Sequence, residues 1–300
     1  MSKRPSGIVC PLATPLNRNE ELDRRGLQRL VDRILPHVDG VFLLGSSSEF
    51  PLLRDTVSQE VVDVAIEHIN RSVPVYVGVG ATSTSRALQN LPRAVDAGAD
   101  FAVALTGFYH AVPDQRAIKK HFLCIAEASE LPVILYNIPQ NTANPLRPST
   151  VTSLAEHPNI VGIKDSSGDM IAFSAFLRSR SRTFSVMQGR EQLAAASLWL
   201  GSDGIISALG NVAPDLLKRL LVAVQQSDRE VALELQRQVD AVAEIFTHGH
   251  WLSALKASLE ALGIGSGTPI GPQPTCTNDQ KEAIRRILRE VGVMPEQGHE

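Results

Sequence analysis

Short apolar segments alternate with helical patterns eight times along the first three quarters of the chain. The segments are apolar almost throughout, which is typical of parallel strands buried on both faces. The patterns between them repeat apolar residues at three- and four-residue spacing, as amphipathic helices do. The predicted strands span 7–11, 40–45, 73–79, 100–105, 132–137, 160–164, 184–188 and 204–208. The predicted helices span 24–35, 57–69, 83–97, 115–129, 149–155, 169–178, 191–200 and 214–226.

Eight strand–helix units in about 225 residues predict a (β/α)8 barrel, the TIM-barrel fold. A doubly wound sheet would need a glycine-rich phosphate turn after the first strand, but Ala13-Thr-Pro-Leu16 follows instead. After the eighth helix the strand patterns stop. We therefore predict a catalytic barrel over residues 1–226 and a C-terminal three-helix extension over residues 227–300. The helical patterns of the extension span 228–247, 250–262 and 278–291.

Charge and cysteine content restrict the partners that the chain can have. Its formal net charge of -3 argues against nucleic acid or an anionic membrane as the main partner. No run of about 18 apolar residues is present, and the first residues do not resemble a secretory signal. The cysteines, Cys10, Cys124 and Cys276, are far apart and odd in number. They predict neither a disulfide framework nor a metal site, and we expect a cytoplasmic protein without metal or cofactor.

Lys164 is the first candidate for chemistry, because it ends an apolar, β-branched strand. A low-dielectric wall disfavours the charged form of the amine. An uncharged lysine amine is a nucleophile that forms an imine with a ketone. The alternative is a structural lysine that reaches solvent or pairs with Asp165.

Other polar residues follow the ends of the predicted strands, where functional side chains of such barrels gather. The phenol of Tyr136 is suited to moving protons beside an amine. Ser46 and Ser47 follow a glycine, and a turn of that kind presents amides and hydroxyls to a carboxylate. Glu49 is expected to structure this turn. The alternatives are a half-buried strand tyrosine and an ordinary serine-rich loop.

Five motifs follow one another along the chain: Ala13-Thr-Pro15, Gly45-Ser-Ser-Ser-Glu49, Tyr136-Asn-Ile-Pro139, Gly162-Ile-Lys-Asp-Ser-Ser-Gly-Asp169 and Gly204-Ile-Ile-Ser-Ala-Leu-Gly-Asn-Val-Ala-Pro214. Together they resemble the dihydrodipicolinate synthase / N-acetylneuraminate lyase superfamily, over about residues 5 to 292. The resemblance implies a metal-free class I lyase of the barrel fold, in which pyruvate binds as a Schiff base. Such proteins are commonly tetramers built as dimers of tight dimers, so we expect a homotetramer.

The resemblance also implies roles for individual residues. Lys164 matches the imine-forming lysine. Tyr136 matches the proton shuttle, which also contacts the acceptor oxygen. Ser46 and Ser47 match the pair that binds the pyruvate carboxylate, and Ser46 can relay protons. Tyr109 matches a tyrosine that a neighbouring subunit places near the site.

Further positions concern the substrate. Ile206 matches the position whose backbone carbonyl faces the bound keto acid. Gly189 and Arg190 end the seventh predicted strand, near where relatives hold hydroxyls of the substrate. Asn141 stands where dihydrodipicolinate synthases carry an arginine that binds the carboxylate of the semialdehyde. Asparagine brings no charge and no bidentate fork, so a neutral polyol chain suits it better.

The asparagine at position 141 leads us to expect an aldolase that cleaves or forms a 2-keto-3-deoxy sugar acid, or a similar 4-hydroxy-2-keto acid. Its partners are then pyruvate and an aldehyde. In the biosynthetic enzymes of this superfamily, an acidic residue early in the third helix belongs to the site for feedback by lysine. The matching residues 82–86 are basic or neutral here, which strengthens this preference. One alternative is 4-hydroxy-tetrahydrodipicolinate synthase, which condenses pyruvate with aspartate semialdehyde. The other is a non-catalytic barrel that binds a sugar acid or regulates another process.

Overall fold

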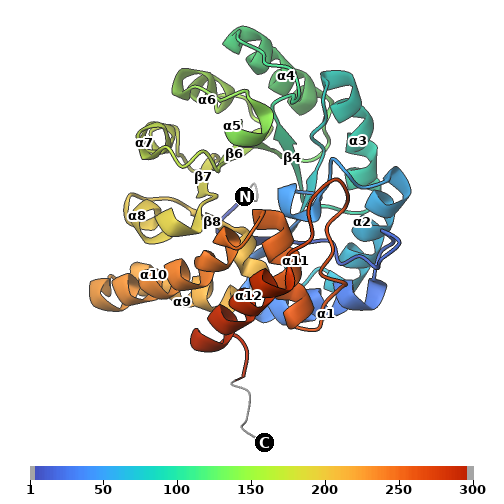
Figure 1. Cartoon of the computed structure of the whole chain (residues 1–300). Coiled ribbons are helices and arrows are strands. Elements are labelled where there is room, and N and C mark those ends of the chain that lie inside the picture. Colours follow the sequence, from blue (N-terminus) through green and yellow to red (C-terminus); the bar gives the residue numbers. More distant parts are fainter. Residues whose placement is uncertain (1–3, 296–300) are drawn as a thin grey trace, which may run out of the picture. The chain divides into compact units, whose positions relative to one another are not determined.

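The computed structural model describes residues 4–295, and Figure 1 labels the helices and some of the strands. Eight parallel strands pair in sequence order and close into a barrel. The predicted (β/α)8 fold is confirmed. The strands are β1 (Gly7–Pro11), β2 (Gly40–Leu43), β3 (Val75–Gly78), β4 (Phe101–Leu105), β5 (Val133–Asn137), β6 (Ile160–Asp165), β7 (Ser185–Gln188) and β8 (Gly204–Ile206).

Helices follow the strands, and the C-terminal helical extension is also confirmed. Within residues 4–295, no helix combines the length and the apolar character needed to cross a membrane. The helices of the barrel region are α1 (Arg24–Ile34), α2 (Asp55–Ile69), α3 (Thr84–Asp96), α4 (Gln115–Ala128), α5 (Pro139–Thr142), α6 (Pro148–Leu154), α7 (Met170–Leu177), α8 (Ala194–Trp199) and α9 (Pro214–Gln225). The later helices are α10 (Arg229–Ala243), α11 (Trp251–Ala261) and α12 (Asn278–Glu290).

Short 3₁₀ turns interrupt the predicted pattern at some element ends. The predicted strand 40–45 stops early, because Leu44 adopts a left-handed φ of 54°. The predicted helix 191–200 divides into a 3₁₀ turn and α8. The 3₁₀ turns are η1 (Leu35–His37), η2 (Ser46–Ser48), η3 (Glu191–Leu193), η4 (Ala208–Asn211) and η5 (Glu244–Thr247).

Side-chain caps fix the starts of several helices. Asp169 accepts hydrogen bonds from the backbone N–H groups of Ile171 and Ala172, at 2.9 and 3.0 Å. Asp169, the first residue of the predicted helix 169–178, is therefore the N-cap of α7. Thr277 and Gln280 form a capping box at the start of α12. These caps satisfy donors that the first turn of a helix leaves without partners.

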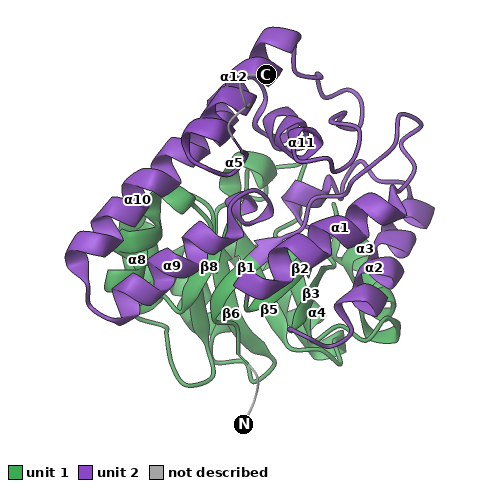
Figure 2. Cartoon of the chain, turned by 90° about the horizontal axis from the view of Figure 1, so that it is seen from below, with its two compact units in different colours: residues 1–9, 39–42, 74–207 green, residues 10–38, 43–73, 208–300 purple. Residues whose placement is uncertain are grey.

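The chain divides into two compact units, which Figure 2 colours separately. Unit 1 comprises residues 1–9, 39–42 and 74–207, and unit 2 comprises residues 10–38, 43–73 and 208–300. Each unit has its own buried apolar side chains, such as Ile134 and Phe173 in unit 1 and Leu27 and Leu255 in unit 2. The boundary predicted at residue 226 stays a prediction.

Strand register within unit 1 aligns Tyr136 and Lys164 near the strand ends. Tyr136 of β5 pairs with Lys164 of β6, and Lys164 pairs with Met187 of β7. Leu105 of β4 pairs with Tyr136 on its other side. Because paired residues lie about 5 Å apart, the register alone places the tyrosine beside the lysine.

Gly204 is a position where the barrel tolerates no side chain. It pairs with Gly7, and an added Cβ would overlap the backbone oxygen and nitrogen of Gly7. We predict that Gly204→Ala lowers the free energy of unfolding by about 2 kcal/mol or more, measured by urea unfolding. At Gly271 an added Cβ meets no atom within 4 Å. Gly271→Ala is therefore the control, and an equal loss in both variants would contradict the argument.

Candidate active site

Lys164 is buried against two aromatic rings within unit 1. The residue is only 4% exposed. Its Nζ lies 4.2 Å from the ring centroid of Tyr136 and 5.4 Å from that of Phe42. An amine over aromatic faces is attracted to their negative charge but receives no hydrogen-bond acceptor from them. The amine therefore stands in a largely apolar environment.

The structural alternative for Lys164, an ion pair with Asp165, is wrong. Successive side chains of a strand point to opposite faces, and Asp165 binds other partners. It accepts hydrogen bonds from Nδ2 of Asn137 at 2.7 Å and from Oγ of Ser167 at 2.9 Å. Within residues 4–295, the Lys164 amine has neither a hydrogen bond nor an ion pair.

Tyr136 is held beside this amine by its strand and by one aromatic neighbour. It is 3% exposed, and its ring meets that of Phe42 edge to face, at 6.2 Å between centroids. Tyr136 and Lys164 are thus the two predicted catalytic residues that unit 1 brings into direct contact.

The loops after β5, β6 and β7 meet at one backbone carbonyl. The oxygen of Ser166 accepts from Nε2 of Gln140 at 2.9 Å and from Nε of Arg190 at 3.0 Å. Gly189 donates its N–H to the oxygen of Asp165 at 2.7 Å. Arg190 and Gly189 therefore lie just beyond the strand end that carries Lys164. No motif distinguishes Gln140 from an ordinary loop glutamine, so its role was not predicted.

Asn141 follows Gln140 in α5 and is exposed. Its backbone N–H donates to the oxygen of Ile138 at 3.0 Å, and its amide side chain has no partner within the described residues. Ile206 ends β8 and is buried. The next residue, Ser207, donates from Oγ to Oε2 of the buried Glu191 at 2.7 Å.

Tyr109 lies apart from the buried pair. Its side chain is 84% exposed, and its ring meets that of His110 edge to face. Its φ of 81° is strained for a residue other than glycine. Asn144, which the sequence analysis missed, holds this loop by donating to the oxygens of Gly107 and His110 at 2.6 and 3.0 Å.

The serine turn, Ser46 to Ser48, lies in unit 2 and forms η2. Ser47 is 4% exposed, and Ser46 is half-buried. Within residues 4–295, neither the backbone N–H nor the hydroxyl of Ser47 has a hydrogen-bond partner. Unused donors of this kind are what an anion requires.

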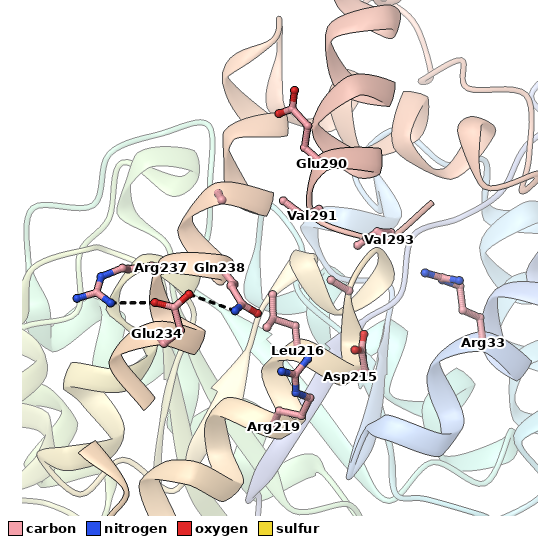
Figure 3. A pocket seen from close by; sticks show the side chains of 13 residues that line it. Arg33, Asp215, Leu216, Arg219, Glu234, Arg237, Gln238, Glu290, Val291 and Val293 are labelled. Carbon is pink, nitrogen blue, oxygen red and sulfur yellow. Dashed lines mark hydrogen bonds and ion pairs between the residues drawn. The ribbon is translucent and has the colours of Figure 1, made fainter. Parts of the chain in front are cut away.

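Unit 2 also contains a cavity of about 710 Å3, shown in Figure 3. Its charged side chains are of both signs, and Glu234 accepts from Arg237 at 2.9 Å and from Gln238 at 3.3 Å. None of the predicted site residues lines it. Among residues 4–295, no group of three or more His, Cys, Asp or Glu side chains is arranged to hold a metal ion. The charged residues that line the cavity are Arg33, Asp215, Arg219, Glu234, Arg237 and Glu290.

Comparison with known proteins decides the family. A family model described as the dihydrodipicolinate synthetase family matches residues 4–291. The chain belongs to this family. Members of the dihydrodipicolinate synthetase family are pyruvate-dependent lyases and synthases, so the predictions of the family and of a lyase are confirmed.

Individual members of the dihydrodipicolinate synthetase family match almost the whole chain. A 4-hydroxy-tetrahydrodipicolinate synthase of Methanopyrus kandleri is 34% identical, covering 97% of this chain and 98% of that protein. The structure of YagE, a prophage protein of this family from E. coli K12 in complex with pyruvate, is 28% identical. Its TM-score is 0.91, and the match covers 96% of this chain and 99% of that one. A dihydrodipicolinate synthase from Acinetobacter baumannii, complexed with pyruvate, is 29% identical with a TM-score of 0.91, and covers the same shares.

The buried carboxylate of Asp165 predicts a pH-dependent change in stability. Burial raises the pKa of Asp165 above its ordinary 3.8, and hydrogen bonds from Asn137 and Ser167 oppose this only in part. A carboxyl whose pKa is raised by folding destabilises the folded chain. The destabilisation grows as the pH rises from the pKa of the unfolded chain through the higher pKa of the folded chain. An amide at this position keeps an acceptor for Asn137 and lets the Ser167 hydroxyl accept. We predict that Asp165→Asn gains in urea midpoint over the parent, and that the gain grows from about pH 4 to about pH 7.5.

Asp114 provides the control for this pH dependence. It is exposed, and a hydrogen bond from Arg116 lowers the pKa of its carboxyl. Asp114→Asn should therefore lose, rather than gain, relative stability as the pH rises. A pH-independent difference for Asp165→Asn would contradict the assignment of a destabilising buried carboxylate.

Proposed function

We propose that this chain is a class I aldolase in which Lys164 binds pyruvate as an imine and the second partner is an aldehyde. The observation that carries the proposal is the buried Lys164 amine, stacked on Tyr136 and Phe42 and without any hydrogen bond or ion pair in residues 4–295. A purely structural buried lysine needs a partner for its charge. An amine that acts as a nucleophile must instead lose its proton.

The reaction proceeds through the imine. The Lys164 amine attacks the keto carbon of pyruvate to form a carbinolamine. The carbinolamine takes up a proton and loses water, which gives a protonated imine. Its electron withdrawal makes the methyl group acidic, and loss of a proton from that carbon gives an enamine. The enamine carbon attacks the aldehyde carbon, and the aldehyde oxygen takes up a proton. Water then hydrolyses the imine and releases a 4-hydroxy-2-keto acid, and cleavage follows these steps in reverse.

The remaining site residues serve this chemistry in the proposal. Tyr136 moves protons at the imine nitrogen and contacts the aldehyde oxygen, which its contact with Lys164 supports. Ser46 and Ser47 bind the carboxylate of pyruvate, which the unused donors of Ser47 support. Ser46 also relays protons, and the backbone oxygen of Ile206 faces the bound keto acid.

The aldehyde half is a sugar chain in the lead form of this proposal. Asn141 brings an uncharged amide whose side chain has no partner among residues 4–295, and such an amide suits a hydroxyl better than a carboxylate. Arg190 and Gly189 lie beyond the lysine strand and bind hydroxyls further along the chain. The substrate is then a 2-keto-3-deoxy sugar acid.

The second candidate is 4-hydroxy-tetrahydrodipicolinate synthase. It is favoured by the names of relatives, such as the Methanopyrus kandleri protein at 34% identity. Both candidates require the same imine and differ in the acceptor. The third, a non-catalytic binding barrel, is disfavoured because a buried Lys164 without a hydrogen bond or ion pair in residues 4–295, together with Tyr136, serves no purpose in simple binding.

Two further expectations remain part of the proposal. The chain acts as a homotetramer built from dimers, and the exposed Tyr109 completes the site of a neighbouring copy. Its 84% exposure is compatible with such a role, since a contact with another copy would cover the ring. The cytoplasmic location also stays a prediction, based on the spacing of three cysteines.

Reduction of the imine tests the proposed mechanism. With pyruvate and borohydride, we expect one adduct per chain, located at Lys164 by mass spectrometry of peptides. Lys164→Ala should form none, and Lys164→Arg should also form none, because an arginine stays protonated. An adduct on another lysine, or none in the parent chain, would contradict the proposal.

Substrate comparison separates the two enzymes. We predict that cleavage of keto-deoxy sugar acids exceeds condensation with aspartate semialdehyde in kcat/KM. Asn141→Arg should raise kcat/KM for the semialdehyde by about ten-fold or more, because a bidentate guanidinium recognises its carboxylate. The matched control is Asn141→Gln, which adds length but no charge. Faster turnover of the semialdehyde by the parent would favour the synthase.

A further inference from the structure

Glu49 anchors the serine turn of unit 2 to distant parts of the chain. It ends η2 with a left-handed φ of 61°, and its backbone N–H donates to the oxygen of Ser46 at 3.1 Å. Its carboxylate is fully buried. Oε2 accepts the backbone N–H of Ile270 at 2.7 Å, and Oε1 lies 2.7 Å from Nζ of Lys256. One carboxylate thus joins the turn to α11 and to the loop after it.

Lys256 is the counter-ion of this carboxylate and is itself buried. Its side chain is 3% exposed, and its Nζ also donates a short hydrogen bond to the backbone oxygen of Thr14. Burial lowers the pKa of Lys256, and the charge and hydrogen bond of Glu49 oppose that shift. The ammonium therefore binds the serine turn and the segment after β1 at the same time.

That segment is tied to the serine turn a second time. Thr14 donates from Oγ1 to the oxygen of Ser48 at 3.0 Å, and Ser48 donates from Oγ to the oxygen of Leu12 at 2.6 Å. Asn211 fixes the same segment by accepting from the N–H of Ala13 at 2.9 Å. Ser48 and Glu49 of the turn are therefore bonded to distant segments, while the N–H and hydroxyl of Ser47 have no partner among residues 4–295.

A buried ion pair adds little stability by itself, because desolvation of both charges offsets their attraction. An apolar pair of similar volume would serve the fold as well. The pair between Glu49 and Lys256 does something that an apolar pair cannot: its directional contacts fix the backbone of a turn with a left-handed residue.

We propose that Lys256 is a positioning residue for the keto-acid substrate. Through Glu49 it holds the backbone and hydroxyls of Ser46 and Ser47 in the geometry that binds the carboxylate. This inference rests on the proposed function, in which those serines bind pyruvate. It makes α11 of the C-terminal extension part of the substrate site, although Lys256 touches no substrate atom.

The test measures pyruvate binding in Lys256→Met and in Glu49→Gln. Adduct formation at Lys164 is followed by borohydride trapping over a series of pyruvate concentrations. We expect both variants to raise the half-saturating concentration by about ten-fold or more, with the trapped fraction at saturation near that of the parent. Lys256→Arg should restore part of the affinity. Because both residues act through one contact, the double variant should raise the half-saturating pyruvate concentration by less than the product of the two single fold-increases.

Lys281→Met is the matched control. Lys281 pairs with Glu260 of α11 at 2.6 Å, and neither residue bonds to the serine turn among residues 4–295, so the loss of Lys281 should leave half-saturation unchanged. A merely structural role for Lys256 would reduce the amount of trappable folded protein without moving half-saturation. A half-saturating pyruvate concentration within two-fold of the parent value in folded Lys256→Met or Glu49→Gln would overturn the inference. If Lys256→Met does not fold, the result for Glu49→Gln decides the test.

Hydrogen exchange separates this inference from the proposed function. In Lys256→Met, the amides of residues 45–53 should exchange faster than in the parent, while Lys281→Met leaves them unchanged. A parent chain without any adduct would overturn the proposed function and not the anchoring. Unchanged exchange in this segment would overturn the anchoring itself.

Discussion

The structure depends for its chemistry on the burial of one amine. Lys164 projects from β6, and its amine lies against the ring of Tyr136 on the adjacent strand β5 and the ring of Phe42 on β2. Removing an ammonium from water costs several kcal/mol unless a carboxylate or hydrogen bonds replace the solvent. The nearest carboxylate in sequence, Asp165, points to the other face and binds Asn137. The proposed imine chemistry follows from this position, in which the amine has aromatic neighbours but no hydrogen bond or ion pair among residues 4–295.

Much of the fold could be predicted from local patterns. The apolar strand segments gave the order and number of strands, because parallel strands buried on both faces read as continuous apolar runs. Asp169 marked the start of α7 through its capping chemistry. Predicted element ends were less accurate where the backbone leaves regular geometry, as at Leu44 and Glu49, whose left-handed φ angles no pattern indicates.

The candidate site could be predicted only in part. Lys164 and Tyr136 were found because their residue types are unusual at strand ends and because their motifs match a family. Asn144 and Gln140 were missed, since an ordinary amide acquires its role only when the fold brings a loop carbonyl within reach. The pairing of Glu49 with Lys256 spans more than two hundred residues, and no local spacing connects them.

Covalent capture of pyruvate in a crystal tests the central claim most directly. Crystals of the chain soaked in pyruvate should show continuous electron density from Nζ of Lys164 to the keto carbon. The carboxylate should lie on the amides and hydroxyls of Ser46 and Ser47. An unmodified Lys164 at saturating pyruvate, or a pyruvate bound elsewhere, would contradict the account.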